Sequence, residues 1–250
     1  MHRLANGIIA PIREGNIAHP TTNLGTWATL FDLAGRFNEI DGVVVVLFNS
    51  GSYRKNIGVK NDVGATRHRV VEAAALGSVL TLLAADLLGL RGGAVVAIAL
   101  SAALAHGVRW LLWRPWKTRA APLVWVLHLA YAWIPLHLGL RAAAEMGWVP
   151  GSAAAHALTV GAVGGLIIGM MTRIARGHTA RPLVADRFDA TCYALVSTAA
   201  VVRVVLPLAA PAWAMAAVLG SAALWSAGFA LYALRYWPVL TRPRLDGKPG

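Results

Sequence analysis

Residues 152–172 read SAAAHALTVGAVGGLIIGMMT and contain no aspartate, glutamate, lysine or arginine. An α-helix rises about 1.5 Å per residue, so about 20 residues cross the roughly 30 Å hydrocarbon core of a bilayer. The stretch has this length and is nearly free of charge. It is therefore predicted to be a transmembrane helix.

Further segments of similar length and composition occupy most of the chain beyond residue 70. The predicted spans are residues 72–90, 94–113, 122–140, 152–172, 188–209 and 213–236. They are rich in alanine, leucine, valine and glycine, and none shows the long polar–apolar alternation of a barrel strand. We predict an all-α, polytopic transmembrane bundle of about six helices.

The composition of the whole chain agrees with a membrane protein. Of its 250 residues, 57% are hydrophobic and only 14% are charged, which excludes an ordinary soluble enzyme of this size. The formal net charge of +12 lies mainly in the connections between spans, so it does not indicate nucleic-acid binding. The single cysteine, Cys192, excludes an internal disulfide and the multi-cysteine metal motifs.

The charge distribution predicts three segments. Residues 1–70 form a polar N-terminal segment, whose longest apolar run, residues 43–48, has the length of a strand rather than of a span. Residues 71–240 form the six-helix transmembrane domain, and residues 241–250 form a basic tail. The N-terminus has no apolar stretch of signal-peptide length, so no cleaved secretion signal is expected. The polar segment shows no catalytic motif.

Lysine and arginine residues indicate how the spans are oriented, because cytoplasmic connections retain positive charge. These residues are frequent before the first span, after the second and fourth spans, and at the C-terminus, and they are sparse in the other connections. We therefore predict that both termini lie in the cytoplasm.

Four histidines lie inside the predicted spans, where ionisable side chains are costly and indicate function. Their depths along the helices place His106 and His128 at one level and His137 and His156 at another. Each pair comes from consecutive antiparallel helices. Imidazoles that face each other in a bundle can hold a haem iron or a copper ion. The alternative is that each histidine forms a hydrogen bond across a helix interface.

Other polar residues in the spans have two interpretations each. Asp86 and Arg203 either form an ion pair, or Arg203 extends to the outer surface. Arg109, one turn after His106, either extends to the inner surface or contacts a haem propionate. Tyr131 hydrogen-bonds either a ligand or another buried group.

Glycines recur at every fourth residue of the fourth span, at positions 161, 165 and 169. A stripe of small residues lets a neighbouring backbone come close. The stripe therefore packs against either another helix or a flat cofactor.

Several of these segments resemble the NnrS family of membrane proteins. The resemblance is carried by PLVWVLHLAYAW at residues 122–133, by HALTVGAVGG at residues 156–165, by residues 169–173 and 177–183, and by residues 109–116. Together these motifs cover most of the segment between residues 75 and 240, and a match of this length is specific.

The resemblance implies a function. NnrS proteins are polytopic proteins of the bacterial inner membrane that contain haem and copper and are linked to nitric oxide metabolism and to tolerance of nitrosative stress. This chain is accordingly expected to bind haem, and copper with it, and to take nitric oxide as a ligand. His128, His156 and His178 fall in the histidine-bearing motifs and are the leading metal-ligand candidates. The cofactor-binding candidates that rest mainly on position are His106, His137, Tyr131 and Arg109.

The chain also departs from the family pattern. His178 lies in a Gly-His-Thr loop, where it is either a surface ligand or a loop-ordering residue, and Ala180 follows where the family usually has glycine. The family typically has about twice as many spans, and this chain resembles its C-terminal half. A cofactor site between two halves would need either a second copy of the chain, in a homo-oligomer, or a separate N-terminal half.

Two other function classes remain open from the sequence. A metal-free transporter or channel would use the intramembrane histidines and the Asp86–Arg203 pair as a path for protons or solutes. A structural membrane subunit would use them only for packing.

Overall fold

The computed structural model describes residues 68–247, and this part of the chain is helical without any strand. The predicted polar segment, residues 1–70, lies outside the described residues except for its last three positions. The described helices are α2 (Arg69–Leu87), α3 (Gly93–Leu112), α4 (Pro122–Glu145), α5 (Gly151–His156), α6 (Gly164–His178), α7 (Arg187–Ala209) and α8 (Ala214–Leu240). The all-α prediction is confirmed.

Six stretches within the described range are long and apolar enough to cross a membrane. Five of them are α2, α3, α4, α7 and α8 with a preceding 3-10 turn, Pro211–Trp213. The fourth span in chain order is continuous from Gly151 to His178, because a π-helical segment, Ala157–Val163, joins α5 to α6. The number of spans agrees with the sequence prediction.

The third, fourth and sixth predicted spans ended too early, the last at residue 236 although α8 continues to Leu240. The third span was expected to stop at residue 140, but α4 continues to Glu145 because its polar side chains find partners. Arg141 pairs with Asp86, and Glu145 accepts a 2.6 Å hydrogen bond from the backbone N–H of Gly92. The fourth span was expected to stop at residue 172, yet α6 continues to His178.

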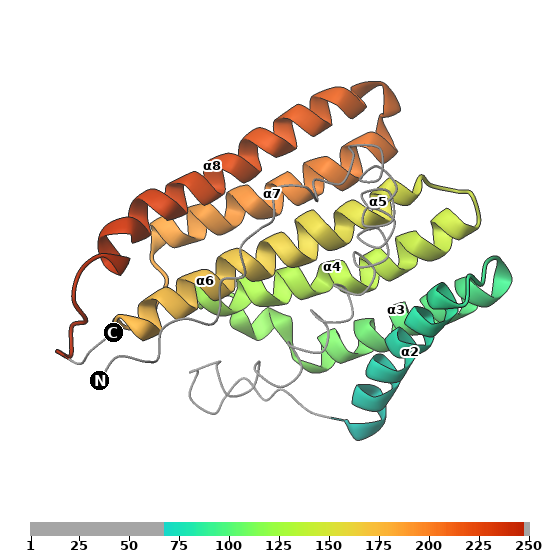
Figure 1. Cartoon of the computed structure of the whole chain (residues 1–250), viewed down its shortest axis with the longest axis horizontal. Coiled ribbons are helices and arrows are strands. Elements are labelled where there is room, and N and C mark those ends of the chain that lie inside the picture. Colours follow the sequence, from blue (N-terminus) through green and yellow to red (C-terminus); the bar gives the residue numbers. More distant parts are fainter. Residues whose placement is uncertain (1–67, 248–250) are drawn as a thin grey trace, which may run out of the picture. The chain divides into compact units, whose positions relative to one another are not determined.

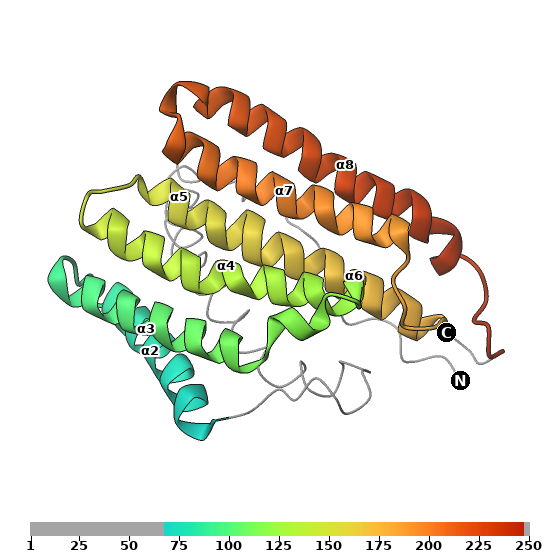
Figure 2. The ribbon, with the colours of Figure 1, turned by 180° about the vertical axis from the view of Figure 1, so that it is seen from behind.

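The helices pack in chain order as an antiparallel row (Figures 1 and 2). α2 packs on α3, α3 on α4, α4 on the continuous α5–α6 helix, that helix on α7, and α7 on α8. One end of the row holds the start of α2, the α3–α4 and α6–α7 connections and the end of α8. We call it the basic end, because these connections, the adjoining turns of the helices and the residues after α8 together carry most of the lysine and arginine residues of the described range.

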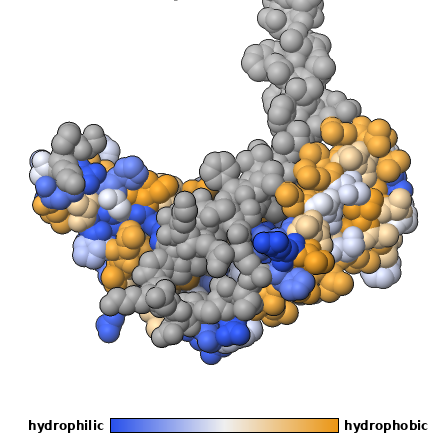
Figure 3. All heavy atoms as spheres, turned by 90° about the horizontal axis from the view of Figure 1, so that it is seen from below, coloured by the Kyte–Doolittle hydropathy of each residue, from blue (hydrophilic) through white to orange (hydrophobic). Residues whose placement is uncertain are grey.

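Many large apolar side chains face outward from this row. Leu104 is 69% exposed, Leu219 65% and Leu234 73%, and Figure 3 shows broad hydrophobic areas on one face. Apolar surfaces of this extent are not stable in water but match the interior of a bilayer. The protein is therefore a multi-pass membrane protein.

The glycine stripe packs against α4, which confirms the helix-packing interpretation and not the flat-cofactor one. A Cβ atom added at any of the three glycines would overlap a side chain of α4. It would lie 2.4 Å from Trp133 at Gly161, 2.8 Å from Ala130 at Gly165 and 2.9 Å from Val126 at Gly169. Each step of four residues along this span thus corresponds to a step of three or four residues back along α4. This correspondence fixes the register of the two helices.

We expect Gly161→Ala to lower the free energy of unfolding by about 1–3 kcal/mol, because the new methyl group would overlap the indole of Trp133. Thermal unfolding of the detergent-purified protein measures this change. Gly107→Ala is the matched control, since nothing lies within 4 Å of a Cβ at that helical position. The control should be neutral or slightly stabilising. Equal effects of the two substitutions would contradict the packing argument.

Candidate functional site

An open pocket of about 490 Å³ lies at the basic end, beside the α3–α4 connection. Its walls are mainly aromatic and apolar, with one imidazole and one guanidinium. The lining residues are Trp110, Pro115, Trp116, Thr118, Arg119, Trp125, His128 and Leu129. The pocket combines a flat apolar wall, a metal-ligating side chain type and a cation.

His128 is held in the pocket wall by its neighbours on α3. The indole N–H of Trp110 donates a 2.8 Å hydrogen bond to the backbone carbonyl of His128, which ties α3 to α4 at this level. The imidazole meets the ring of Trp113 edge-on, with 6.3 Å between ring centroids. His128 is only 2% exposed although it lines the pocket. Its position is thus set by packing on two helices.

A buried ion pair lies beside the pocket wall. Arg109 is 3% exposed, and its Nε and Nη2 donate to the two carboxylate oxygens of Glu72 at 3.2 and 2.8 Å. Its Nη1 donates to the hydroxyl of Tyr131 at 3.1 Å, and its guanidinium lies 4.8 Å from the centre of the Trp113 ring. The expectation that Arg109 extends to the inner surface is wrong, because Glu72 supplies a counter-charge within the bundle.

His106 continues this network into the bundle. The backbone carbonyl of Ala75 can only accept a hydrogen bond, so Nε2 of His106 carries the proton and donates to it at 3.1 Å. In the neutral imidazole, Nδ1 then accepts from the Tyr131 hydroxyl at 2.6 Å. Both ring nitrogens are engaged, so in this arrangement His106 joins α2, α3 and α4, as in the hydrogen-bonding alternative.

His106 and His128 differ in level by about one helical turn, because His106 meets Tyr131 whereas His128 meets Trp110 and Trp113, and other rings lie between the two imidazoles. His106 contacts Tyr131, Tyr131 contacts Trp113, and Trp113 contacts His128, with centroid distances of 5.9, 4.6 and 6.3 Å. The two imidazoles therefore do not form a facing pair. They are the two ends of a chain of four rings.

The second histidine pair lies toward the other end of the bundle. Nδ1 of His137 donates to the backbone carbonyl of Ala154 at 2.8 Å, two residues before His156. This agrees with the predicted common level of His137 and His156. No hydrogen bond or ring contact joins the two imidazoles themselves. The bond to Ala154 fixes the orientation of the His137 ring and leaves its Nε2 for another partner.

The prediction that Asp86 forms an ion pair with Arg203 is wrong. Asp86 pairs instead with Arg141, which lies just beyond the predicted third span, because the additional residues of α4 bring Arg141 alongside α2. Arg203 lies on α7, within electrostatic range of His156. Its side chain is half-buried.

The three motif histidines do not meet. The register of the glycine stripe places His128 level with residue 167, so His156 and His178 lie about 16 Å away in opposite directions along the helix. His178 is an exposed residue at the end of α6, not a loop residue. Within residues 68–247, no three His, Cys, Asp or Glu side chains are placed to hold a metal ion together.

The Gly-His-Thr motif caps α6. The N–H of Arg181 bonds the carbonyl of Arg176 at 2.9 Å and the N–H of Ala180 bonds that of Gly177 at 3.3 Å, which is the Schellman pattern. Thr179 is buried, and its hydroxyl donates to the carbonyl of Ala175 at 2.6 Å. The threonine, rather than the histidine, therefore orders this end of the helix.

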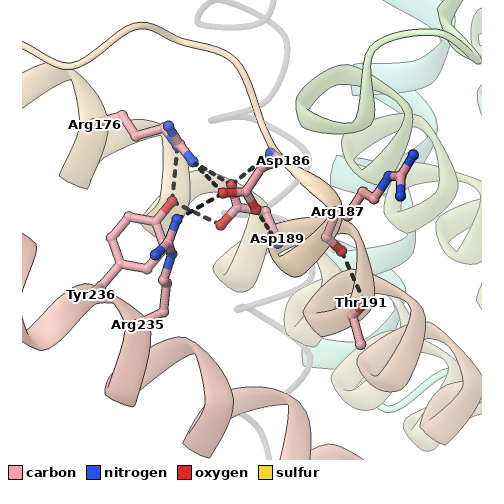
Figure 4. A network of polar contacts seen from close by, with 7 residues as sticks. All are labelled: Arg176, Asp186, Arg187, Asp189, Thr191, Arg235 and Tyr236. Carbon is pink, nitrogen blue, oxygen red and sulfur yellow. Dashed lines mark hydrogen bonds and ion pairs between the residues drawn. The ribbon is translucent and has the colours of Figure 1, made fainter.

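A second polar cluster holds α6, α7 and α8 together at the basic end (Figure 4). The buried carboxylate of Asp189 accepts from Arg176 at 2.6 Å and from the Tyr236 hydroxyl at 3.0 Å. Asp186 caps α7 through the Asp189 amide and accepts from Arg235 at 2.9 Å. Partial burial opposes ionisation of Asp186, but these two bonds outweigh it and lower its pKa.

Sequence reasoning missed Glu72, Arg141 and the Asp186–Asp189 pair as structural charges. The sequence contained a signal for Glu72 and for the Asp186–Asp189 pair. Glu72 and Arg109 lie at the same end of consecutive antiparallel spans, and Asp186 and Asp189 have the spacing of a capping box before a helix. The partner of Arg141 could not be found in this way, because it depends on how far α4 extends.

Comparison with known proteins gives one match. A family model described as NnrS protein matches residues 44–244, which is more than half of the chain and includes the pocket and all six spans. No curated protein and no solved structure shows a significant match.

Glu72→Gln should lower the free energy of unfolding by about 1–3 kcal/mol, because it leaves the Arg109 guanidinium buried without a counter-charge. This loss of unfolding free energy is smaller than that expected for a fully buried ion pair, because the Glu72 side chain is 23% exposed. Thermal unfolding in detergent measures the change. Asp246→Asn, at an exposed ion pair with Arg244, is the control and should have no measurable effect. Identical behaviour of the two variants would disprove the role of Glu72.

Ala180→Gly should raise the free energy of unfolding by about 0.5–1 kcal/mol, because Ala180 has a φ angle of 56°, a left-handed conformation that costs a residue with a Cβ. Glycine, which the family resemblance implies at this position, adopts this conformation without that cost. Ala216→Gly, on the exposed surface of α8, should instead be destabilising. A melting temperature of Ala180→Gly below that of the wild type would contradict the argument that the backbone of Ala180 is strained.

Proposed function

This chain belongs to the NnrS family, and on that premise we propose that it is a haem-binding protein of the bacterial inner membrane. It serves in nitric oxide metabolism or in tolerance of nitrosative stress, as the family resemblance implies. The proposal is supported chiefly by the pocket that contains His128.

The residues of this pocket fit a haem. Porphyrin is flat and apolar, and the indoles of Trp110, Trp116 and Trp125 supply an apolar aromatic wall. His128 supplies an imidazole, the commonest protein ligand of haem iron. Arg119 supplies a cation that suits a propionate carboxylate. The pocket therefore has a group for each part of the cofactor.

When bound, haem would supply an iron that can take nitric oxide as a ligand. The residues of this chain would position that group. Trp113 and the Trp110 bond to the His128 carbonyl fix the helix that carries the imidazole. Arg109 stays engaged with Glu72 and Tyr131, so Arg119 is the cation assigned to the cofactor.

The geometry gives no comparable support for copper. Copper(II) sites commonly use tetragonal sets of ligands, whereas residues 68–247 bring no three candidate side chains together. His137 and His156 supply two imidazoles at a common level, and no third His, Cys, Asp or Glu side chain of residues 68–247 joins them. The proposal is therefore restricted to haem.

We place the basic end in the cytoplasm and the other end toward the outside of the cell. The placement is supported by the arginine and lysine residues of the α3–α4 and α6–α7 connections, because cytoplasmic connections retain positive charge. It puts the haem pocket near the cytoplasmic surface.

The detergent-purified wild type, expressed with adequate haem, should show a Soret band that shifts on addition of nitric oxide. His128→Gly should lose most of this band, because the iron loses its imidazole, and free imidazole should restore part of it. Absorption spectra of the oxidised and dithionite-reduced protein measure both effects.

His178→Gly is the matched control, because that histidine is exposed at the end of α6, and it should keep the wild-type spectrum. A colourless wild type would contradict the proposal, and proton-coupled flux in vesicles would then favour the transporter class. If the Soret band were lost in His137→Gly but kept in His128→Gly, the haem site would have to lie at the other end of the bundle.

A further inference from the structure

Arg173, on α6 at the basic end, is a buried cation that has no partner among residues 68–247. It is only 8% exposed, and no ion pair or hydrogen bond of its guanidinium occurs within the described part of the chain. Other buried arginines of the bundle are neutralised: Arg109 by Glu72 and Arg176 by Asp189. A guanidinium that is largely covered by protein and has no counter-charge is unfavourable, so an anion at this position would be stabilised.

The register between α6 and α4 locates Arg173 along α4. Arg173 is one helical turn beyond Gly169, which lies beside Val126 and Leu127. Continuing the same spacing by one turn places Arg173 level with Pro122 and the residue after it, where α4 begins. A cation and a helix N-terminus are thus brought to one level.

The start of α4 is itself electropositive and lacks an acidic cap. Its first turn contains no acidic residue, and the N-cap residue, Ala121, has no capping side chain. Val124 and Trp125 both donate to the Ala121 carbonyl, and Pro122 has no N–H, so the amide of Leu123 is left without a backbone acceptor. The helix macrodipole adds a partial positive charge at this end.

The surrounding connection adds charge of the same sign. Residues 114–121 contain Arg114, Lys117 and Arg119 and no acidic residue. The start of α7, at the same end of the bundle, has the opposite arrangement, since Asp186 caps it and pairs with Arg235. The start of α4 therefore has the donors of an anion site without an anionic side chain to occupy it.

We propose that Arg173 and the first turn of α4 bind an oxyanion of the phosphate type. The guanidinium offers paired N–H donors that match a phosphate, and helix N-termini bind phosphates through backbone amides. Two sources share this chemistry: the headgroup of an acidic phospholipid, which lies at the level of the helix ends in a bilayer, and free inorganic phosphate. The site does not depend on haem binding.

The experiment compares full-length protein in nanodiscs of phosphatidylcholine with and without phosphatidylglycerol. In the wild type, phosphatidylglycerol should raise the melting temperature by about 3–6 °C, as expected for a ligand that binds only the folded state. Arg173→Gln should remove this rise and weaken phosphatidylglycerol binding, counted by native mass spectrometry, about tenfold. Arg173→Lys keeps the charge and should retain part of the response.

A second arm titrates inorganic phosphate into detergent-purified protein against chloride at matched ionic strength. Stabilisation by phosphate that is lost in Arg173→Gln would support the site and identify the free ion as a sufficient ligand. Arg187→Gln is the control, because it removes an exposed cation from the same end and should respond like the wild type. Failure of both probes to stabilise the wild type, or equal responses of Arg173→Gln and the wild type, would overturn the proposal.

Discussion

Close packing between α4 and the helix that follows it is the contact on which the rest of the structure depends. Three glycines let that helix approach until its backbone meets Trp133, Ala130 and Val126. Lipid is as apolar as leucine, so helices in a bilayer associate through close fit and polar contacts rather than through the hydrophobic effect. The contact makes α4 the most buried span and fixes the level of every group on it.

Polar groups within the bundle are satisfied in pairs between neighbouring helices. Glu72 with Arg109 joins α2 to α3, Asp86 with Arg141 joins α2 to α4, and Asp189 with Arg176 joins α7 to α6. Each pair lies toward an end of the spans, where the cost of burying charge is lower than at the bilayer centre.

The basic end concentrates both proposed sites. The pocket with His128 and the positive start of α4 follow from the same α3–α4 connection, which is basic, aromatic and free of acidic residues. An aromatic wall suits a flat apolar ligand, whereas the uncapped helix start suits a small anion. The two sites differ in chemistry and use different residues, so each can fail or succeed alone.

The sequence by itself determined the helical class, the number of spans and the family, because apolar length and charge placement are local properties that a bilayer enforces on any chain. It also placed His137 and His156 at one level. It could not decide which groups touch, because that depends on helix rotation and on how far each helix extends. Only the tertiary structure paired Asp86 with Arg141, engaged both nitrogens of His106, and buried Arg173 with no counter-charge among the described residues.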